Sequence, residues 1–271
     1  MNLQRFLAAP VAFGLTLGTF YVLNLPAYAK TVNVTVPKTA VAIAFNTAFS
    51  STKVHLDNYG KKHGSSWHQD SSYVLLPNGA KESFLIPEYK HKVTKFRQLK
   101  YYIDNMNTSS IQATINGSRI QATARFESQG EEIKAKCVRR RFGKWGECKL
   151  KMERDIHLNN SILSMSLIPV AYNGSISYAN PKVDFKTDLR IPNKLCQAFK
   201  GICSRIQNKI KGELTKNIET QLANGLNNPK VKDKVANSVK KSLASRLGQY
   251  KNWKITKVSS NGNNFILNLR N

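Results

Sequence analysis

Acidic residues are scarce in this chain: it has 16 Asp and Glu against 42 Lys and Arg among 271 residues, which gives a formal net charge of +26 at pH 7. Carboxylates so few and scattered offer little for acid–base catalysis. The nucleophile-elbow, zinc-protease, phosphate-loop and kinase signatures are also missing from the sequence. We therefore expect a protein that is not an enzyme and has no cofactor.

Residues with metal-ligand character are equally sparse. The one suggestive group lies in a polar stretch around Trp67 and consists of His55, Asp57, His63, His68 and Asp70. Imidazole and carboxylate groups that gather in space can bind a metal ion. Histidines scattered along a surface loop give the same pattern, and we expect no metal site here.

Only one apolar run is long: residues 6–25, interrupted by Pro10. Arg5 precedes it, and Ala27-Tyr28-Ala29 supplies the small-x-small pattern of a cleavage site before Lys30. We predict a secretory signal peptide in residues 1–29, cleaved after Ala29, and a secreted or periplasmic protein. An uncleaved membrane anchor is the alternative, because about 20 apolar residues can span a bilayer.

Cleavage removes Arg5 and leaves residues 30–271, whose 41 basic and 16 acidic residues give a net charge of +25. No Pro/Ser-rich linker divides this stretch, so we predict a single domain. Within it, we expect residues 30–193 to be mostly β, residues 194–249 to be helical, and residues 250–271 to form a β-hairpin.

Four cysteines in an exported chain predict two disulfides. Cys137 and Cys148 flank a hairpin end with two glycines, and a bridge between them would fix its base. Cys196 and Cys203 close a shorter loop; seven residues of α-helix span about 10.5 Å, too far for a disulfide, so a helix would begin after this pair. Pairing across the two segments is the alternative, and neither spacing has the CxxC form of a zinc site.

Residues 30–191 are dominated by the period-two alternation of β-strands. Three Asn-Gly dipeptides, at 78–79, 116–117 and 173–174, mark turns. Apolar residues alternate along the flanking segments, as Leu163, Met165 and Leu167 do. This pattern predicts an antiparallel meander with one buried face. Residues 41–49 are small and apolar and fit either a strand or a short helix.

Towards the C-terminus the apolar period changes to four. Seven aliphatic residues, here called the aliphatic ladder, follow this spacing: Ile202, Ile206, Ile210, Leu214, Ile218, Leu222 and Leu226. Each four-residue step overshoots a helical turn by about 40°, so the ladder winds about 240° around one long helix. A strongly twisted sheet that wraps the helix would cover such a line, and so would a helix broken near Gly212.

A second helix follows the first. Asn224-Gly225 predicts the end of the long helix, and Asn228-Pro229 predicts the start of another that ends at Gly248. The last residues alternate around Asn261-Gly262 and predict a hairpin that returns to the sheet. The predicted fold class is α+β, with a twisted antiparallel sheet packed on a long C-terminal helix pair and a closing β-hairpin.

This order of elements resembles the tubular lipid-binding superfamily, the group of proteins like the bactericidal permeability-increasing protein. The resemblance covers about residues 160–271 and rests on strand pairs that end in residues 181–188 (Pro-Lys-Val-Asp-Phe-Lys-Thr-Asp), the aliphatic ladder and the last strand pair. It implies a twisted antiparallel sheet rolled around a long helix, with an apolar channel for acyl chains. The family's long helix near the mature N-terminus has no clear counterpart in this sequence.

Two roles are open for the aliphatic ladder: plain core, or one wall of a channel for an acyl chain. In the second role the channel residues would be Ile206, Ile210, Leu214, Ile218 and Leu222. Export and the winding apolar line motivate the channel as a hypothesis.

The second indication of function is a basic hairpin end that also carries aromatic residues. Its candidate residues for an anionic surface are Arg139, Arg140, Arg141, Phe142, Lys144 and Trp145. Guanidinium groups on phosphates and rings at headgroup level suit peripheral contact with an anionic lipid membrane. We therefore expect a binding protein for an amphipathic anionic ligand, such as a lipid, a glycolipid or another envelope component.

Other partners remain open for a surface of this charge. A basic module that binds acidic polysaccharide or another polyanion is the alternative function, and nucleic acid is a less favoured partner. A basic surface that only keeps the protein soluble would have no dedicated partner. The sequence leaves the oligomeric state open.

Overall fold

A computed structural model of the chain describes residues 29–63, 66–127, 133–148, 156–190 and 200–271. The predicted signal peptide lies outside this part up to residue 28, as do Cys196 and the side chains of Cys203, Ile202 and Ile206. The predictions that concern these groups stay predictions. Among the described helices, none combines the length and the apolarity that a membrane crossing needs.

Alternating apolar residues build one large antiparallel sheet. Its eight strands are β2 (Lys53–Leu56), β5 (Ser72–Leu75), β6 (Lys81–Phe84), β9 (Met106–Thr108), β10 (Gln112–Asn116), β11 (Arg119–Glu127), β14 (His157–Tyr172) and β15 (Ser175–Arg190). They follow the order β15-β14-β11-β9-β2-β5-β6, with β10 paired to β11. Turns that begin at residues 77, 117 and 173 each join two paired strands, which confirms the three predicted hairpins.

The predicted C-terminal helix pair is confirmed, and it consists of α3 (Lys200–Leu226) and α4 (Pro229–Leu247). Helix α3 is continuous through Gly212, so the alternative of a broken helix is wrong. It begins at Lys200, before Cys203, and it runs past the predicted stop to Leu226, whose side chain is buried. The Asn228 side chain accepts a hydrogen bond from Lys230 N and caps α4 as predicted.

Residues 41–49, which fit a strand or a short helix by sequence, belong to helix α1 (Lys38–Ser50). Its buried residues recur at helical spacing: Val41, Ala44, Phe45, Ala48 and Phe49. The helix packs against α4 and β10. The sequence left this segment open because its small apolar residues fill an i, i+3, i+4 stripe that also fits a strand. Helix α1 has 13 residues, against 27 in α3, so it does not overturn the expectation that a long helix is lacking there.

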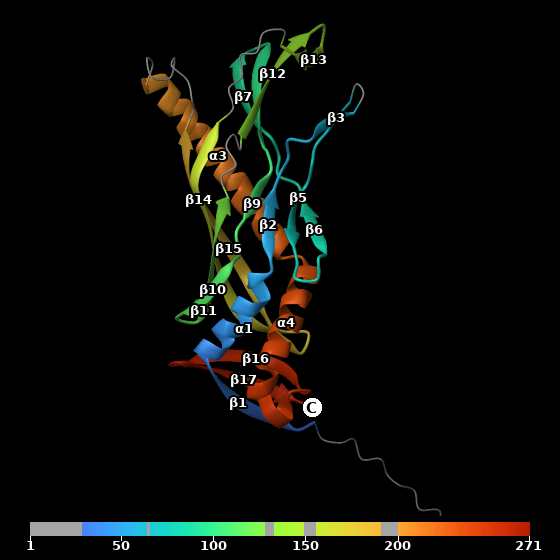
Figure 1. Cartoon of the computed structure of the whole chain (residues 1–271), viewed down its shortest axis with the longest axis vertical. Coiled ribbons are helices and arrows are strands. Elements are labelled where there is room, and N and C mark those ends of the chain that lie inside the picture. Colours follow the sequence, from blue (N-terminus) through green and yellow to red (C-terminus); the bar gives the residue numbers. More distant parts are fainter. Residues whose placement is uncertain (1–28, 64–65, 128–132, 149–155, 191–199) are drawn as a thin grey trace, which may run out of the picture.

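The large sheet curls until both of its edges meet α3 (Figure 1). One edge strand is β15 and the other is β6, and α3 packs against both of them as well as against β5. Contacts on different sides of the helix explain why the aliphatic ladder winds around it. Its described members are at most 2% exposed: Ile210, Leu214, Ile218, Leu222 and Leu226. The predicted wrapping of the helix by a twisted sheet is confirmed.

Helix α3 also contacts both edges of the sheet closely, and at one edge it accepts a backbone hydrogen bond. The backbone N–H of Phe185, on edge strand β15, donates to Glu219 Oε1 over 2.9 Å. Near the other edge, the ring of Phe84 packs closely against Gly225. A covered edge has fewer unpaired backbone groups to recruit another chain. The helix therefore completes the sheet rather than lying on it.

The closing hairpin is confirmed as β16 (Lys254–Asn261) and β17 (Asn264–Arg270), followed in space by β1 (Thr31–Pro37) in the order β1-β17-β16. The prediction that this hairpin returns to the main sheet is wrong. Alternating valines of β1 supply its partner strand instead, with Val34 opposite Leu267. The short 3₁₀ helix η1 (Gly248–Tyr250) leads from α4 into this terminal sheet.

A third sheet lies at the opposite end of the elongated molecule (Figure 1). It consists of β13 (Lys144–Glu147), β12 (Ile133–Arg141), β8 (Arg97–Ile103) and β7 (Tyr89–Thr94), in that order. A two-stranded ribbon of β3 (Lys61–His63) and β4 (Ser66–His68) accompanies it. Cys137 and Cys148 form the predicted disulfide between β12 and the end of β13. That bond excludes the alternative pairing with Cys196 or Cys203.

Candidate site for an anionic surface

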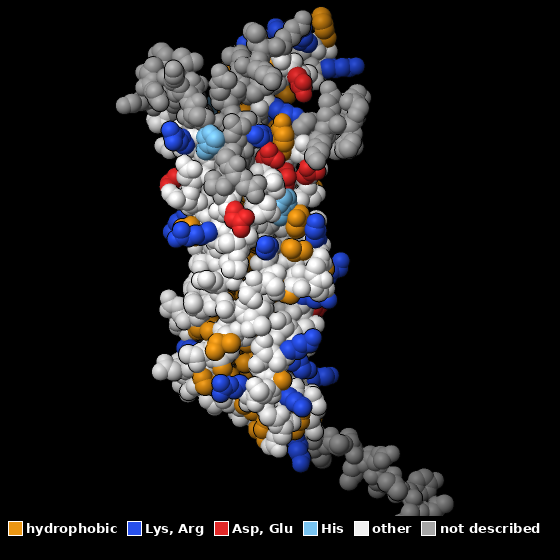
Figure 2. Space-filling model, in the orientation of Figure 1, with side chains coloured by type: hydrophobic (Ala, Val, Ile, Leu, Met, Phe, Trp, Pro, Cys, Tyr) orange, Lys and Arg blue, Asp and Glu red, His pale blue; other side chains and the backbone are white. Residues whose placement is uncertain are grey.

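Two hairpin turns lie side by side at the far end of the third sheet, and together they form the basic–aromatic tip. Its residues are Val93, Lys95, Phe96, Arg97, Arg139, Arg140, Arg141, Phe142, Lys144 and Trp145. The backbone N–H of Arg140 donates to the Phe96 carbonyl over 2.9 Å and joins the two turns. Figure 2 shows basic and apolar side chains together at the end of the molecule where β12 and β13 lie.

The turn between β12 and β13 presents an aromatic ring at its apex. Phe142 and Gly143 both have positive φ, 48° and 79°, as a two-residue type I′ turn requires. Glycine tolerates this conformation, whereas a non-glycine residue there costs about 1–3 kcal/mol. The Phe142 side chain is 102% exposed. Phe142 is thus unfavourable in two ways: its apolar ring is exposed to water, and its backbone has a positive φ.

Exposed apolar side chains are concentrated at this tip. Six large apolar residues are exposed in the described part of the chain, and four of them belong to the tip: Val93, Phe96, Phe142 and Trp145. The other two, Ile43 and Leu85, lie on α1 and after β6. An apolar group gathered at one end marks an interaction surface more strongly than single exposed residues do.

The basic residues of the tip face one another across the strands. Arg139 lies directly opposite Arg97, and Arg141 lies directly opposite Lys144. Like charges in directly opposed positions destabilise a sheet. In the described part of the chain, Arg139, Arg141 and Lys144 have no acidic partner. An anion bound at the tip would therefore relieve repulsion as well as form new ion pairs.

The disulfide holds the base of this hairpin. Cys137 and Cys148 have a Cα–Cα distance of 5.4 Å, and the Cys148 N–H also donates to the Cys137 carbonyl over 3.1 Å. Strand β12 continues into the sheet by pairing with β8, so the hairpin is anchored on both sides. The tip is thus a fixed projection of the third sheet.

All six residues predicted for an anionic surface lie in the basic–aromatic tip. The other half of the tip was not predicted from the sequence: Val93, Lys95, Phe96 and Arg97. Those residues stand about 40 positions earlier, and only the pairing of β8 with β12 brings them alongside. A signal was present, because Lys92, Lys95 and Arg97 surround Phe96 with charge.

Four of the five predicted channel residues lie in the hydrophobic core. Ile210, Leu214, Ile218 and Leu222 are at most 1% exposed, and the side chain of Ile206 lies outside the described part. No ladder residue lines the hollow beside α4 or the hollow between α3 and β15. The acyl channel between α3 and the sheet stays a prediction.

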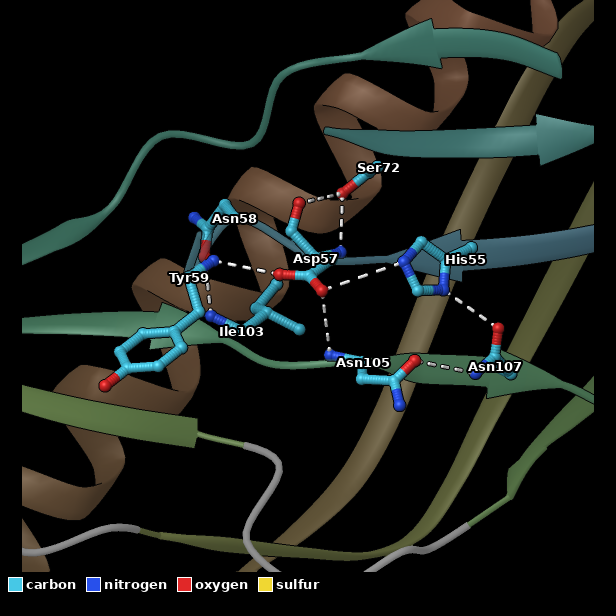
Figure 3. A network of polar contacts seen from close by, with 8 residues as sticks. All are labelled: His55, Asp57, Asn58, Tyr59, Ser72, Ile103, Asn105 and Asn107. Atoms are coloured by element: carbon cyan, nitrogen blue, oxygen red, sulfur yellow. Dashed lines mark hydrogen bonds and ion pairs between the residues drawn. The ribbon is translucent and has the colours of Figure 1, made fainter. Parts of the chain in front are cut away.

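Two members of the His/Asp group, His55 and Asp57, belong to a buried polar network (Figure 3). The His55 ring lies 2.8 Å from Asn107 Oδ1 through Nδ1, and 3.8 Å from Asp57 Oδ2 through Nε2. It also stacks on Tyr73, with ring centroids 4.5 Å apart. These contacts connect β2, β5 and β9 within the main sheet.

Asp57 organises the loop that follows β2 (Figure 3). Its carboxylate accepts hydrogen bonds from Tyr59 N over 2.9 Å and from Asn105 N over 3.3 Å. Burial raises the pKa of Asp57, and the Tyr59 hydrogen bond opposes that rise. The Ser72 hydroxyl bonds the Asp57 backbone, so no Ser–His pair forms here. The hydrogen bonds of His55 and Asp57 therefore hold the loop after β2 against β5 and β9, which is a structural role.

In the described part of the chain, the other members of the His/Asp group do not contribute to the network of His55 and Asp57. Asp70 is exposed, and the side chains of His63 and His68 lie outside the described part. Across the described residues, no group of three or more His, Cys, Asp or Glu is placed to hold a metal ion.

No family model and no curated protein matches this chain. Among solved structures, the chain is similar to a lipopolysaccharide binding protein, with 10% sequence identity and a TM-score of 0.29. The similarity covers 81% of this chain and 49% of that protein, so this chain spans about half of its length.

Proposed function

We propose that this protein is a non-enzymatic binding protein for an amphipathic anionic ligand, namely a lipid, a glycolipid or another envelope component at a membrane surface. The observation that carries this function is the basic–aromatic tip. Among the described residues, it combines four of the six exposed large apolar side chains with Arg139, Arg141 and Lys144, which form no ion pair there. Rings inserted at headgroup level and guanidinium groups on phosphates together recognise an anionic membrane.

The aromatic residues favour a lipid surface over an acidic polysaccharide. A polyanion needs only the charges, and it gains little from Phe142 at the apex of the turn. A membrane gains from both, because apolar rings enter the interface while the basic groups stay at the phosphates. The Cys137–Cys148 bond supports an oxidising compartment, in keeping with secretion or a periplasm and with cleavage after Ala29.

Vesicle binding tests this function directly. The wild-type protein should sediment with vesicles of phosphatidylglycerol and phosphatidylcholine and should remain in solution with phosphatidylcholine alone. Replacement of Arg139, Arg140 and Arg141 by Ala should weaken binding to the anionic vesicles by at least about tenfold, since each basic residue near such a surface contributes about 1 kcal/mol.

The matched control replaces three exposed lysines outside the tip by Ala: Lys53, Lys182 and Lys257. It removes the same net charge, so it should retain most of the binding if the tip is the contact. Equal losses in the two triple variants would show that only the overall charge matters, and the function proposed for the tip would be wrong. Stronger binding to heparin than to anionic vesicles would favour the polyanion alternative.

The acyl channel is tested separately. If α3 and the sheet hold an acyl chain, organic-solvent extraction of the purified protein should release lipid in a fixed molar ratio to the chain. Recovery of no lipid, together with no binding of a fluorescent fatty acid, would leave the aliphatic ladder as core. That outcome would not affect vesicle binding through the tip.

A further inference from the structure

A basic hollow of about 650 Å³ lies on the outer face of α4, far along the chain from the residues of the tip. Helix α4 forms one wall, the turn between β5 and β6 forms a second, and the segment between η1 and β16 forms a third. Four lysines line it: Lys234, Lys240, Lys241 and Lys251. Its volume falls within the range of small-molecule sites, about 300–1,000 Å³.

The two faces of α4 explain why these lysines converge. The inner face buries Val231, Val235, Val239 and Leu243 against the rest of the protein. Lys234 and Lys241 stand seven residues apart, so they share one stripe of the outer face. Lys251 reaches the same hollow from the following segment. The amides of Asn78 and Asn252 add donors and acceptors to the walls.

The charge of this hollow is not neutralised by the protein. No acidic residue lines it, and within the described part of the chain none of the four lysines forms an ion pair. Nearby carboxylates are engaged elsewhere: Asp233 accepts from Asn173 over 2.6 Å, and Glu82 lies 3.8 Å from the Lys230 ammonium. Several uncompensated ammonium groups around one concave site attract a multivalent anion.

We propose that this hollow binds a sugar that carries two or more phosphate groups, either as a free molecule or as a lipid headgroup. The lysines supply charged donors for separate phosphates, and the side chains of Asn78 and Asn252 suit sugar hydroxyls. This site does not depend on membrane binding by the tip, because no residue lines both.

Isothermal titration with fructose 1,6-bisphosphate, fructose and inorganic phosphate tests the site. The bisphosphate should bind at least about tenfold more tightly than inorganic phosphate, because two phosphates engage separate lysines at about 1.4 kcal/mol or more for the second contact. Fructose should not bind measurably. Failure of the bisphosphate to bind, or equal affinity for inorganic phosphate, would overturn the site.

Paired variants then locate the binding. Lys241→Gln with Lys251→Gln should weaken binding of the bisphosphate by at least about tenfold, since each replacement removes a charged donor to a phosphate group. The control, Lys182→Gln with Lys257→Gln, removes equal charge from exposed positions outside the hollow and should change the affinity by less than about twofold. Equal losses in both variants would overturn the assignment, provided that both melt at the wild-type temperature.

The tip variant separates this site from the function of the tip. The variant with Ala at positions 139, 140 and 141 should keep full affinity for the bisphosphate even where it no longer binds vesicles; a matching loss of affinity would overturn the independence of the two sites. The same tip variant is then tested with vesicles that contain phosphatidylinositol 4-phosphate. If it binds them, and if the Lys241 and Lys251 replacements abolish that binding, the ligand is a lipid headgroup. Binding of the free bisphosphate without such vesicle binding would assign a soluble ligand.

Discussion

The hydroxyl group of Tyr178 donates a hydrogen bond to the carbonyl oxygen of Leu226 over 2.9 Å, and the Tyr178 side chain is only 1% exposed. Leu226 is the last residue of α3, where helix carbonyls have no partner within the helix. This bond therefore fastens the end of the long helix to edge strand β15, where Phe49 also packs on the Tyr178 ring. Burial raises the pKa of Tyr178, so the phenol remains a donor.

Replacement of Tyr178 by Phe should lower the free energy of unfolding by about 1–2 kcal/mol, because the buried Leu226 carbonyl loses its donor. Urea denaturation measures this loss. The control is Tyr172→Phe on the neighbouring strand, whose hydroxyl forms no described hydrogen bond, and it should change stability by less than about 0.5 kcal/mol. Equal losses in the two variants would contradict the role of the Leu226 contact.

Two glycines of α3 should respond differently to alanine. A Cβ at Gly212 meets nothing within 4 Å, so Gly212→Ala should raise the free energy of unfolding by about 0.5–1 kcal/mol through helix propensity. A Cβ at Gly225 would lie 3.2 Å from the ring of Phe84, so the same change there should stabilise less or destabilise. Thermal and urea unfolding of both variants would show the order; a larger gain at Gly225 would contradict the close packing of β6 on α3.

The stability of the fold should depend on the protonation of Asp57. Its folded pKa lies above the ordinary value of 3.8, so the folded state binds the proton more tightly than the unfolded state does. The resulting stabilisation is complete below the unfolded pKa and is lost as the pH rises through the folded pKa. Asp57→Asn removes this dependence, so wild type should gain stability relative to the variant between about pH 7 and about pH 4. Urea denaturation at both pH values measures the difference in unfolding free energy between wild type and the variant. The same difference at both pH values would contradict the role of Asp57 protonation.

The aromatic rings of the tip should contribute to the affinity for vesicles through an apolar contact that salt does not screen. Replacement of Phe142 and Trp145 by Ser should weaken binding to anionic vesicles by about tenfold or more while the slope of affinity against salt stays unchanged. The Arg139, Arg140 and Arg141 variant should instead flatten that slope. Sedimentation at several salt concentrations separates the two effects, and an aromatic variant with wild-type binding would remove the rings from the contact.

Local structure was largely predictable from the sequence. Asn-Gly dipeptides mark the turns because Gly adopts positive φ readily, as Gly79, Gly117 and Gly174 do, and at the third turn Asn173 does so too. The four-residue period identified α3 as a long helix that a curved sheet must surround, because a flat partner covers only a narrow stripe. These signals act over a few residues, and the chain carries them directly.

The choice of partners between distant segments was not predictable. Period-two alternation shows that 31–37 and 264–270 are strands, yet it does not say that Val34 lies opposite Leu267 rather than at the edge of the main sheet. The same limit hid half of the basic–aromatic tip, because Arg97 and Arg139 meet only through the register of β8 and β12. Residues 41–49 stayed open between a strand and a short helix for another reason, since small apolar residues fit both periods.

The pairing of β1 with β17 has a consequence for biogenesis. Strands β1 and β17 are separated by almost all of the other described elements along the chain, and Thr31 lies opposite Arg270. Both segments must therefore have left the ribosome before β1 can pair with β17. Until then the valines of β1 have no partner strand.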